Sequence, residues 1–246
     1  MRGGLIAASL LALVALAAVS AATAATPQVI HYVSLGDSVT TVTPSFVGMV
    51  AKSAHTKLHR KVTASNFVED GDVSALVGRV KTDPELKATL RSADLITITI
   101  GANEIGASLD RIANKTCGGG GGLACVRTAE RRFERSYRAL LDQLTLLRSH
   151  KEAAYRLLTS FDTPSVFPAD LGKPFAAALR AENAFVCAQA LARAMKCADV
   201  YAAFNGTDGS QDPLSAGLII QDGHPSAKGS ATIASVVVDL GFAPLH

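Results

Sequence analysis

The chain has 246 residues, a formal net charge of +3 at pH 7 and 48% hydrophobic residues, a composition that suits a folded domain with a full core. The near-neutral charge gives no reason to expect nucleic acid as a partner. Beyond its first 25 residues the chain has no long apolar run, so we expect no stable membrane insertion of the remainder.

Residues 1–25 have the pattern of a secretory signal peptide. Arg2 is the only charged residue ahead of a long run of Leu, Ala, Val and Ile, and small residues follow up to Ala25. We expect cleavage after Ala24 or Ala25, which leaves a secreted single domain over residues 26–246. An uncleaved membrane anchor is the alternative, because the apolar run is nearly long enough to span a bilayer.

Short apolar runs alternate with longer helical patterns along the rest of the chain. The runs predicted as strands are Val29–Leu35, Val62–Phe67, Leu95–Ile100, Ala154–Ser160 and Val200–Phe204. The predicted helices cover about residues 44–58, 84–91, 127–149, 175–195 and 227–240. This alternation predicts an α/β fold, a three-layer α/β/α sandwich around a central parallel sheet of about five strands.

Candidate site residues follow three of the predicted strands. Ser38 stands just past the first strand, Gly71 past the second and Asn103 past the third, while His224 precedes the last predicted helix. The carboxyl ends of parallel strands meet at one edge of a sheet, where sites of this fold class lie. We therefore expect these residues to converge. A serine hydroxyl needs a base beside it to become a nucleophile, and a histidine supplies one.

Four cysteines in an exported chain favour two disulfides, for which three connectivities exist. We favour sequence neighbours: Cys117 with Cys125, which bracket five glycines, and Cys187 with Cys197. The second pair requires its helix to end before Cys197, because ten residues of straight helix would separate the two by about 15 Å. Zinc is disfavoured by the spacings and by the lack of a nearby His.

Four separated blocks make residues 26–246 resemble the SGNH hydrolases, also called the GDSL esterase/lipase family. In chain order the blocks are Gly36-Asp37-Ser38, Asn66 followed by Gly71, Gly101-Ala102-Asn103-Glu104, and Asp222-Gly223-His224-Pro225. Two positions depart from the family pattern, with Val39 in place of Leu and Glu104 in place of Asp. The resemblance implies the flavodoxin-like SGNH hydrolase fold.

The resemblance also implies a role for each block. Ser38 would be the acylated nucleophile and His224 the general base. The oxyanion hole would consist of the backbone N–H groups of Ser38 and Gly71 and the side-chain amide of Asn103. No metal and no organic cofactor is expected.

The sequence leaves three possibilities for the group that orients His224. The family usually places it three residues before the histidine, where this chain has Gln221, and Asp222 is only two before. Asp222 can still reach the imidazole, a backbone carbonyl can orient His224 instead, or the triad is impaired. We prefer Asp222.

The sequence thus predicts a secreted serine esterase or lipase, a monomer that hydrolyses small-molecule or lipid carboxylic esters. A carbohydrate O-acetyl esterase of the same family is the nearest alternative, and a non-catalytic secreted binding protein on this scaffold is another. Segment 69–72 can be a plain turn or a calcium loop, because three of its residues are carboxylates. The glycine-rich segment 104–126 is expected to border the substrate pocket as a disulfide-closed loop.

Overall fold

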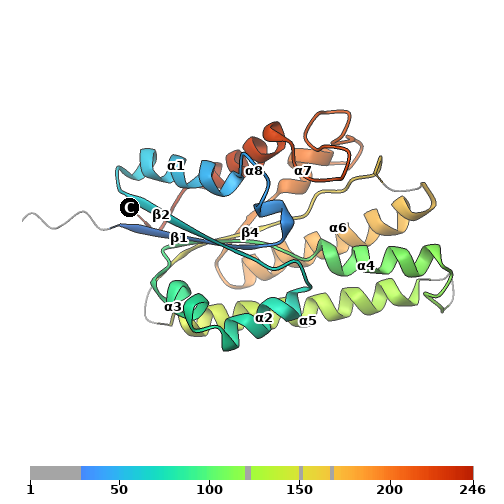
Figure 1. Ribbon diagram of the computed structural model, residues 1–246, viewed down its shortest axis with the longest axis horizontal. Helices are drawn as coiled ribbons and strands as arrows, with labels where there is room; N and C mark the ends of the chain where they lie inside the picture. The colour runs from blue at the N-terminus through green and yellow to red at the C-terminus, as the bar shows by residue number, and fades with distance from the viewer. Residues whose placement is uncertain (1–28, 120–122, 150–151, 167–168, 246) are drawn as a thin grey trace, which may run out of the picture.

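A parallel sheet organises the chain (Figure 1). The computed structural model describes residues 29–119, 123–149, 152–166 and 169–245, so the expected signal peptide lies outside the described residues. Within these residues the sheet has five strands in the order β2-β1-β3-β4-β5, and every neighbouring pair is parallel. The strands are β1 (Ile30–Gly36), β2 (Val62–Val68), β3 (Leu95–Thr99), β4 (Ala154–Leu158) and β5 (Lys196–Ala198). The predicted parallel sheet is confirmed.

Helices cover both faces of the sheet and complete three layers (Figure 1). One face carries α1 (Phe46–Leu58), α7 (Val200–Asn205) and α8 (Ala227–Asp239). The other carries α2 (Val73–Thr82), α3 (Pro84–Ser92), α5 (Ala124–Leu147) and α6 (Ala169–Ala192), with α4 (Ala102–Ala113) packed against α5 and α6. None of the described helices is long and apolar enough to cross a membrane.

The middle strand β3 shows why the sheet is covered on both sides. All five of its residues are buried, as its β-branched sequence predicts. Strand β1 lies beside it and is buried except at His31, whereas the edge strand β2 is partly exposed along its length. The buried strands β1 and β3 therefore anchor the loops that follow them, at Ser38 and at Asn103.

One predicted strand is wrong. Residues 200–204 form helix α7, and the fifth strand is β5 at Lys196–Ala198. The Asp199 carboxylate accepts a 3.0 Å hydrogen bond from the Ala202 backbone N–H and caps the helix. Val200 and Phe204, spaced four apart, are both buried on one helical face. A short apolar run has the same composition in a strand and in a buried helix, and the cap decides between them.

Two helices were not anticipated from the sequence. Helix α2 begins directly after its N-cap, Asp72. Helix α4 covers residues 102–113 and therefore occupies most of the first half of segment 104–126, which was predicted to be a glycine-rich loop. The loop prediction is therefore wrong for that half. Ile105 and Leu109, four residues apart, are both buried, and this helical periodicity outweighs the glycines that follow it in the chain.

Both favoured cysteine pairs form disulfides. Cys117 bonds to Cys125 and lies in a small apolar cluster between α4, α5 and α6. Cys187 of α6 bonds to Cys197 of β5. Helix α6 ends at Ala192, and the chain turns back into β5, as that pairing requires.

Candidate active site

Ser38 begins a short 3-10 turn, residues 38–40, directly after β1. The Asp37 carboxylate accepts a 3.0 Å hydrogen bond from the Val39 backbone N–H, and the Thr40 hydroxyl donates to the Asp37 carbonyl at 2.8 Å. Asp37 is 5% exposed, and burial raises its pKa to about 6. Asp37 thus serves as the cap that fixes the turn presenting Ser38.

Gly36 and Asn66 hold this turn against the sheet. A Cβ on Gly36 would collide with the Thr40 side chain and lie only 2.9 Å from the Thr99 carbonyl oxygen, so the close approach of β1, β3 and the turn requires glycine. The Asn66 side-chain amide, from β2, donates to the Thr40 carbonyl at 3.2 Å. The first two sequence blocks therefore meet around one turn.

His224 contacts Ser38 across 186 residues of sequence. Its Nε2 lies 3.0 Å from the Ser38 Oγ, and its Nδ1 lies 3.1 Å from an Asp222 carboxylate oxygen. The same oxygen accepts a 2.9 Å hydrogen bond from the His224 backbone N–H. With a proton on Nδ1, the histidine donates to Asp222 and accepts from Ser38, which is the arrangement of a serine hydrolase triad.

Asp222 reaches the imidazole despite its shortened spacing because the chain turns sharply at Gly223, whose φ is +87°. The His224 carbonyl also accepts a 2.9 Å hydrogen bond from Ile220, which closes the loop. Hydrogen bonds from the backbone and side chain of His224 lower the pKa of Asp222 below its usual value. The 63% exposure of its side chain also favours the charged form, so Asp222 stays ionised.

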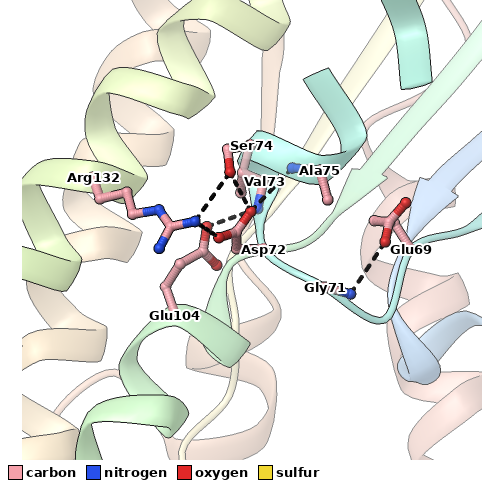
Figure 2. A network of polar contacts seen from close by, with 8 residues as sticks. All are labelled: Glu69, Gly71, Asp72, Val73, Ser74, Ala75, Glu104 and Arg132. Atoms are coloured by element: carbon pink, nitrogen blue, oxygen red, sulfur yellow. Dashed lines mark hydrogen bonds and ion pairs between the residues drawn. The ribbon is translucent and has the colours of Figure 1, made fainter. Parts of the chain in front are cut away.

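The other two predicted oxyanion donors lie on neighbouring segments and have weak partners within the protein. The Asn103 side-chain amide, in the first turn of α4, donates to the Asp70 carbonyl at 3.4 Å. The Gly71 backbone N–H donates to a Glu69 carboxylate oxygen at 3.3 Å (Figure 2). Asn103 lines the same cavity as Ser38, whereas Gly71 lines the neighbouring one.

Segment 69–72 is a turn held by its own carboxylates. Asp72 accepts a 3.0 Å hydrogen bond from the Ala75 backbone N–H at the start of α2, and it forms an ion pair with Arg132 of α5 (Figure 2). Glu69 bonds to Gly71 instead. The carboxylates of Glu69 and Asp72 thus bind different groups of the protein. The described residues contain no group of three or more acidic, His or Cys side chains placed to hold a metal.

Glu104, next to Asn103, was singled out only as a departure from the family pattern. One of its carboxylate oxygens accepts a 2.7 Å hydrogen bond from the Val73 backbone N–H (Figure 2). The residue is 6% exposed, and burial raises its pKa to about 7. Burial and the nearby Glu104 likewise raise the pKa of Glu182 on α6 well above its usual value.

Ser38 and His224 open into a mostly apolar cavity of about 280 Å³. Its apolar wall includes Val39, Leu158, Phe161, Val166, Phe175 and Ile233. A second cavity of about 400 Å³ lies on the other side of α4, and its lining includes the charged residues Arg111 and Arg132. Asn103 borders both. The sequence did not predict the wall residues, because they come from a strand, loops and helices far apart in the chain.

The architecture matches that of several solved structures. A lipase from a goat rumen metagenome superimposes with a TM-score of 0.72 at 22% identity, over 88% of this chain and 100% of that one. A catalytic mutant of an acetylxylan esterase from Geobacillus stearothermophilus gives 0.61 at 18% identity, over 87% and 94%. A protein from Parabacteroides merdae described as a GDSL-like lipase gives 0.61 at 16% identity, over 85% and 94%.

No family model and no curated protein sequence matches the chain. At identities this low the structural likeness establishes the fold. The three-layer α/β fold expected from the sequence is thereby confirmed, and it is shared with structures described as lipases.

Proposed function

We propose that this chain is a serine esterase that hydrolyses carboxylic esters through an acyl-Ser38 intermediate. The observation that carries the proposal is the 3.0 Å contact between the Ser38 Oγ and the His224 Nε2, with Asp222 on the other ring nitrogen. The shared fold with lipases and an acetylxylan esterase supports it.

The reaction follows from this geometry. His224 takes the proton of the Ser38 hydroxyl through Nε2 as Oγ attacks the carbonyl carbon of the ester. When the tetrahedral intermediate collapses, the carbon–oxygen bond to the alcohol breaks, and His224 donates its proton to the departing oxygen. Water then repeats the sequence on the acyl-enzyme and releases the acid. Asp222 holds the imidazole in the required tautomer and stabilises its charge.

The negative oxygen of the intermediate needs hydrogen-bond donors. We assign these to the backbone N–H groups of Ser38 and Gly71 and to the side-chain amide of Asn103, following the family resemblance. The present partners of Gly71 and Asn103 are at 3.3 and 3.4 Å, long enough to be exchanged for an oxyanion at small cost. A shift of the Gly71 N–H from Glu69 toward Ser38 would accompany substrate binding.

The apolar wall of the Ser38 cavity favours acyl or lipid esters over acetylated sugars. Sugar rings commonly stack on aromatic side chains, and the chain has no tryptophan. The likeness to an acetylxylan esterase keeps the carbohydrate O-acetyl esterase as the second candidate. We further propose that residues 1–25 direct secretion and that residues 26–246 act as a monomer. The two disulfides are compatible with an oxidising compartment.

The test uses residues 26–246 with p-nitrophenyl acetate, butyrate, octanoate and palmitate. Wild type should turn over at least one of these esters, and Ser38→Ala and His224→Ala should not. Ser235→Ala, an exposed serine on α8, is the matched control and should retain full activity. A fluorophosphonate should label wild type and Ser235→Ala but not Ser38→Ala.

A folded wild type that is inert toward all of these esters and toward acetylated xylan, and that resists the fluorophosphonate, would overturn the proposal. The non-catalytic binding protein would then be the better interpretation. Activity confined to acetylated xylan would favour the second candidate.

A further inference from the structure

Helix α4 separates the two cavities at the candidate active site and presents a different face to each. Ala102 and Gly106, four residues apart, line the apolar cavity that contains Ser38. Ala107 and Arg111, also four apart, line the second cavity, which contains charged side chains. Because residues four apart share a face of a helix, α4 is a partition with an apolar side toward Ser38.

Nothing in the packing of α4 requires a glycine at position 106. A Cβ built at Gly106 meets no heavy atom within 4 Å, whereas one at Gly36 would collide with its neighbours. No positive φ calls for glycine at this position either. Glycine inside a helix destabilises it relative to alanine. The missing side chain therefore leaves space for a ligand at one wall of the Ser38 cavity.

The volume and the lining of this cavity indicate what fills the space. An engineered cavity of about 150 Å³ in another protein accommodates benzene, so about 280 Å³ has room for roughly ten carbon atoms. Leu158 of β4 and Phe175 of α6 contribute apolar surface to the same cavity as Gly106. An apolar chain of medium length fits these walls, and a hexadecanoyl chain exceeds the volume.

We propose that Gly106 is a specificity-determining residue, whose missing side chain admits acyl chains of about eight to ten carbons into the Ser38 cavity. This inference rests on the proposed esterase function and adds the substrate class, medium-chain acyl esters. The acyl group is assigned to this cavity because it stays bonded to Ser38 after the alcohol has left. The alcohol then departs on the open side of the site, where any leaving group with a hydroxyl can exit.

The experiment measures kcat/KM for p-nitrophenyl acetate, butyrate, octanoate, decanoate and palmitate, so that only the acyl part varies. Wild type should prefer octanoate or decanoate and discriminate against palmitate. Gly106→Leu should lower kcat/KM for octanoate by about tenfold or more, because the leucine occupies the space of several methylenes. Its kcat/KM for acetate should stay within about twofold, and Gly106→Ala should shift the preference in the same direction by less.

Gly78→Leu is the matched control, because Gly78 also lies within a helix and has open space at its Cβ, but it borders neither cavity. This variant should keep the wild-type chain-length profile. Unfolding temperatures confirm that the variants are folded, and both leucine variants should be at least as stable as wild type, since leucine favours helix over glycine.

Two results would overturn the inference while leaving the esterase proposal intact. One is an unchanged chain-length profile in active Gly106→Leu. The other is an equal loss with acetate and octanoate, which would mean that the leucine obstructs Ser38 itself rather than the space for the chain. A wild type inert toward every ester and toward the fluorophosphonate would instead refute the proposed function on which the inference rests.

Discussion

The Glu104 carboxylate and the Val73 backbone N–H are joined by a 2.7 Å hydrogen bond. Glu104 directly follows Asn103 on α4, and Val73 begins α2 two residues after Gly71. One buried contact therefore ties together the two segments that carry proposed oxyanion donors. The Arg132–Asp72 ion pair adds a second tie, from α5, to the start of α2.

Loss of the Glu104–Val73 hydrogen bond should impair turnover more than substrate binding. Glu104→Ala leaves the Val73 N–H without its partner and allows Gly71 and Asn103 to move apart. Complete loss of one oxyanion donor costs about 2.7–4 kcal/mol, so a displaced donor should lower kcat by about tenfold or more with little change in KM.

Steady-state kinetics on p-nitrophenyl butyrate measure the effect. Glu104→Gln keeps an acceptor oxygen and should stay close to wild type, as should the control Glu134→Ala, whose partner is Arg138 on the helix surface. Wild-type kcat in a folded Glu104→Ala would show that the contact does not position the donors.

The buried Glu104 should also make stability depend on pH. Its pKa is raised to about 7 in the folded state, while in the unfolded chain it is near 4.5. Between these values the unfolded state ionises and the folded state stays protonated, so stability is full below about pH 4.5 and is lost as pH rises through about 7. A shift of this size corresponds to a loss on the order of 3 kcal/mol.

Urea unfolding of wild type and Glu104→Gln at pH 4.5, 6 and 8 measures this dependence. The glutamine cannot ionise, so the variant should lose less stability than wild type over this range. Glu182, whose pKa is raised in the same direction, should retain a residual dependence in the variant. Identical slopes in both proteins would contradict the prediction.

Asp222→Asn should lower kcat by roughly 10²–10⁴-fold without unfolding the protein. The amide cannot stabilise the imidazolium and favours the wrong histidine tautomer, which costs about 10⁴-fold where the acid is buried. The exposure of Asp222 to solvent argues for a smaller loss here. Asp208→Asn, at another exposed aspartate, is the control. Near-wild-type kcat would remove Asp222 from the triad.

Loss of the Cys187–Cys197 disulfide should destabilise the fold by roughly 2–3 kcal/mol, since it closes a loop of ten residues. The double variant Cys187→Ala, Cys197→Ala should therefore unfold at lower denaturant concentration than oxidised wild type. Reduction of wild type would also break Cys117–Cys125, so the variant Cys117→Ala, Cys125→Ala, compared in its oxidised and reduced forms, separates the loss of the Cys187–Cys197 cross-link from any change in packing. Equal midpoints for these two forms would show that the cross-link contributes nothing to stability.

The sequence predicted those features that depend on a few neighbouring residues. The strand ending at Gly36, the turn with Ser38 and the block around His224 each occupy a few residues, and the parallel topology brings them to one edge of the sheet. Residues 200–204 were misassigned because a five-residue apolar run does not separate strand from buried helix.

Other features depend on distances that spacing along the chain does not define. Whether Asp222 reaches the imidazole is decided by the turn at Gly223, and its positive φ is not visible in the sequence. The proximity of Glu104 to Glu182 likewise follows from the packing of α4 on α6, and α4 was expected to be a loop. Long-range packing, rather than local propensity, accounts for both.

The sequence separation of 186 positions from Ser38 to His224 has a consequence for biogenesis. Synthesis runs from the N-terminus, so the growing polypeptide holds the serine long before the histidine leaves the ribosome. A chain that has paired its first strands but has not docked the segment around His224 carries an inert hydroxyl. Under the proposed function, ester cleavage requires this docking, so the appearance of turnover during refolding should report the pairing of Ser38 with His224.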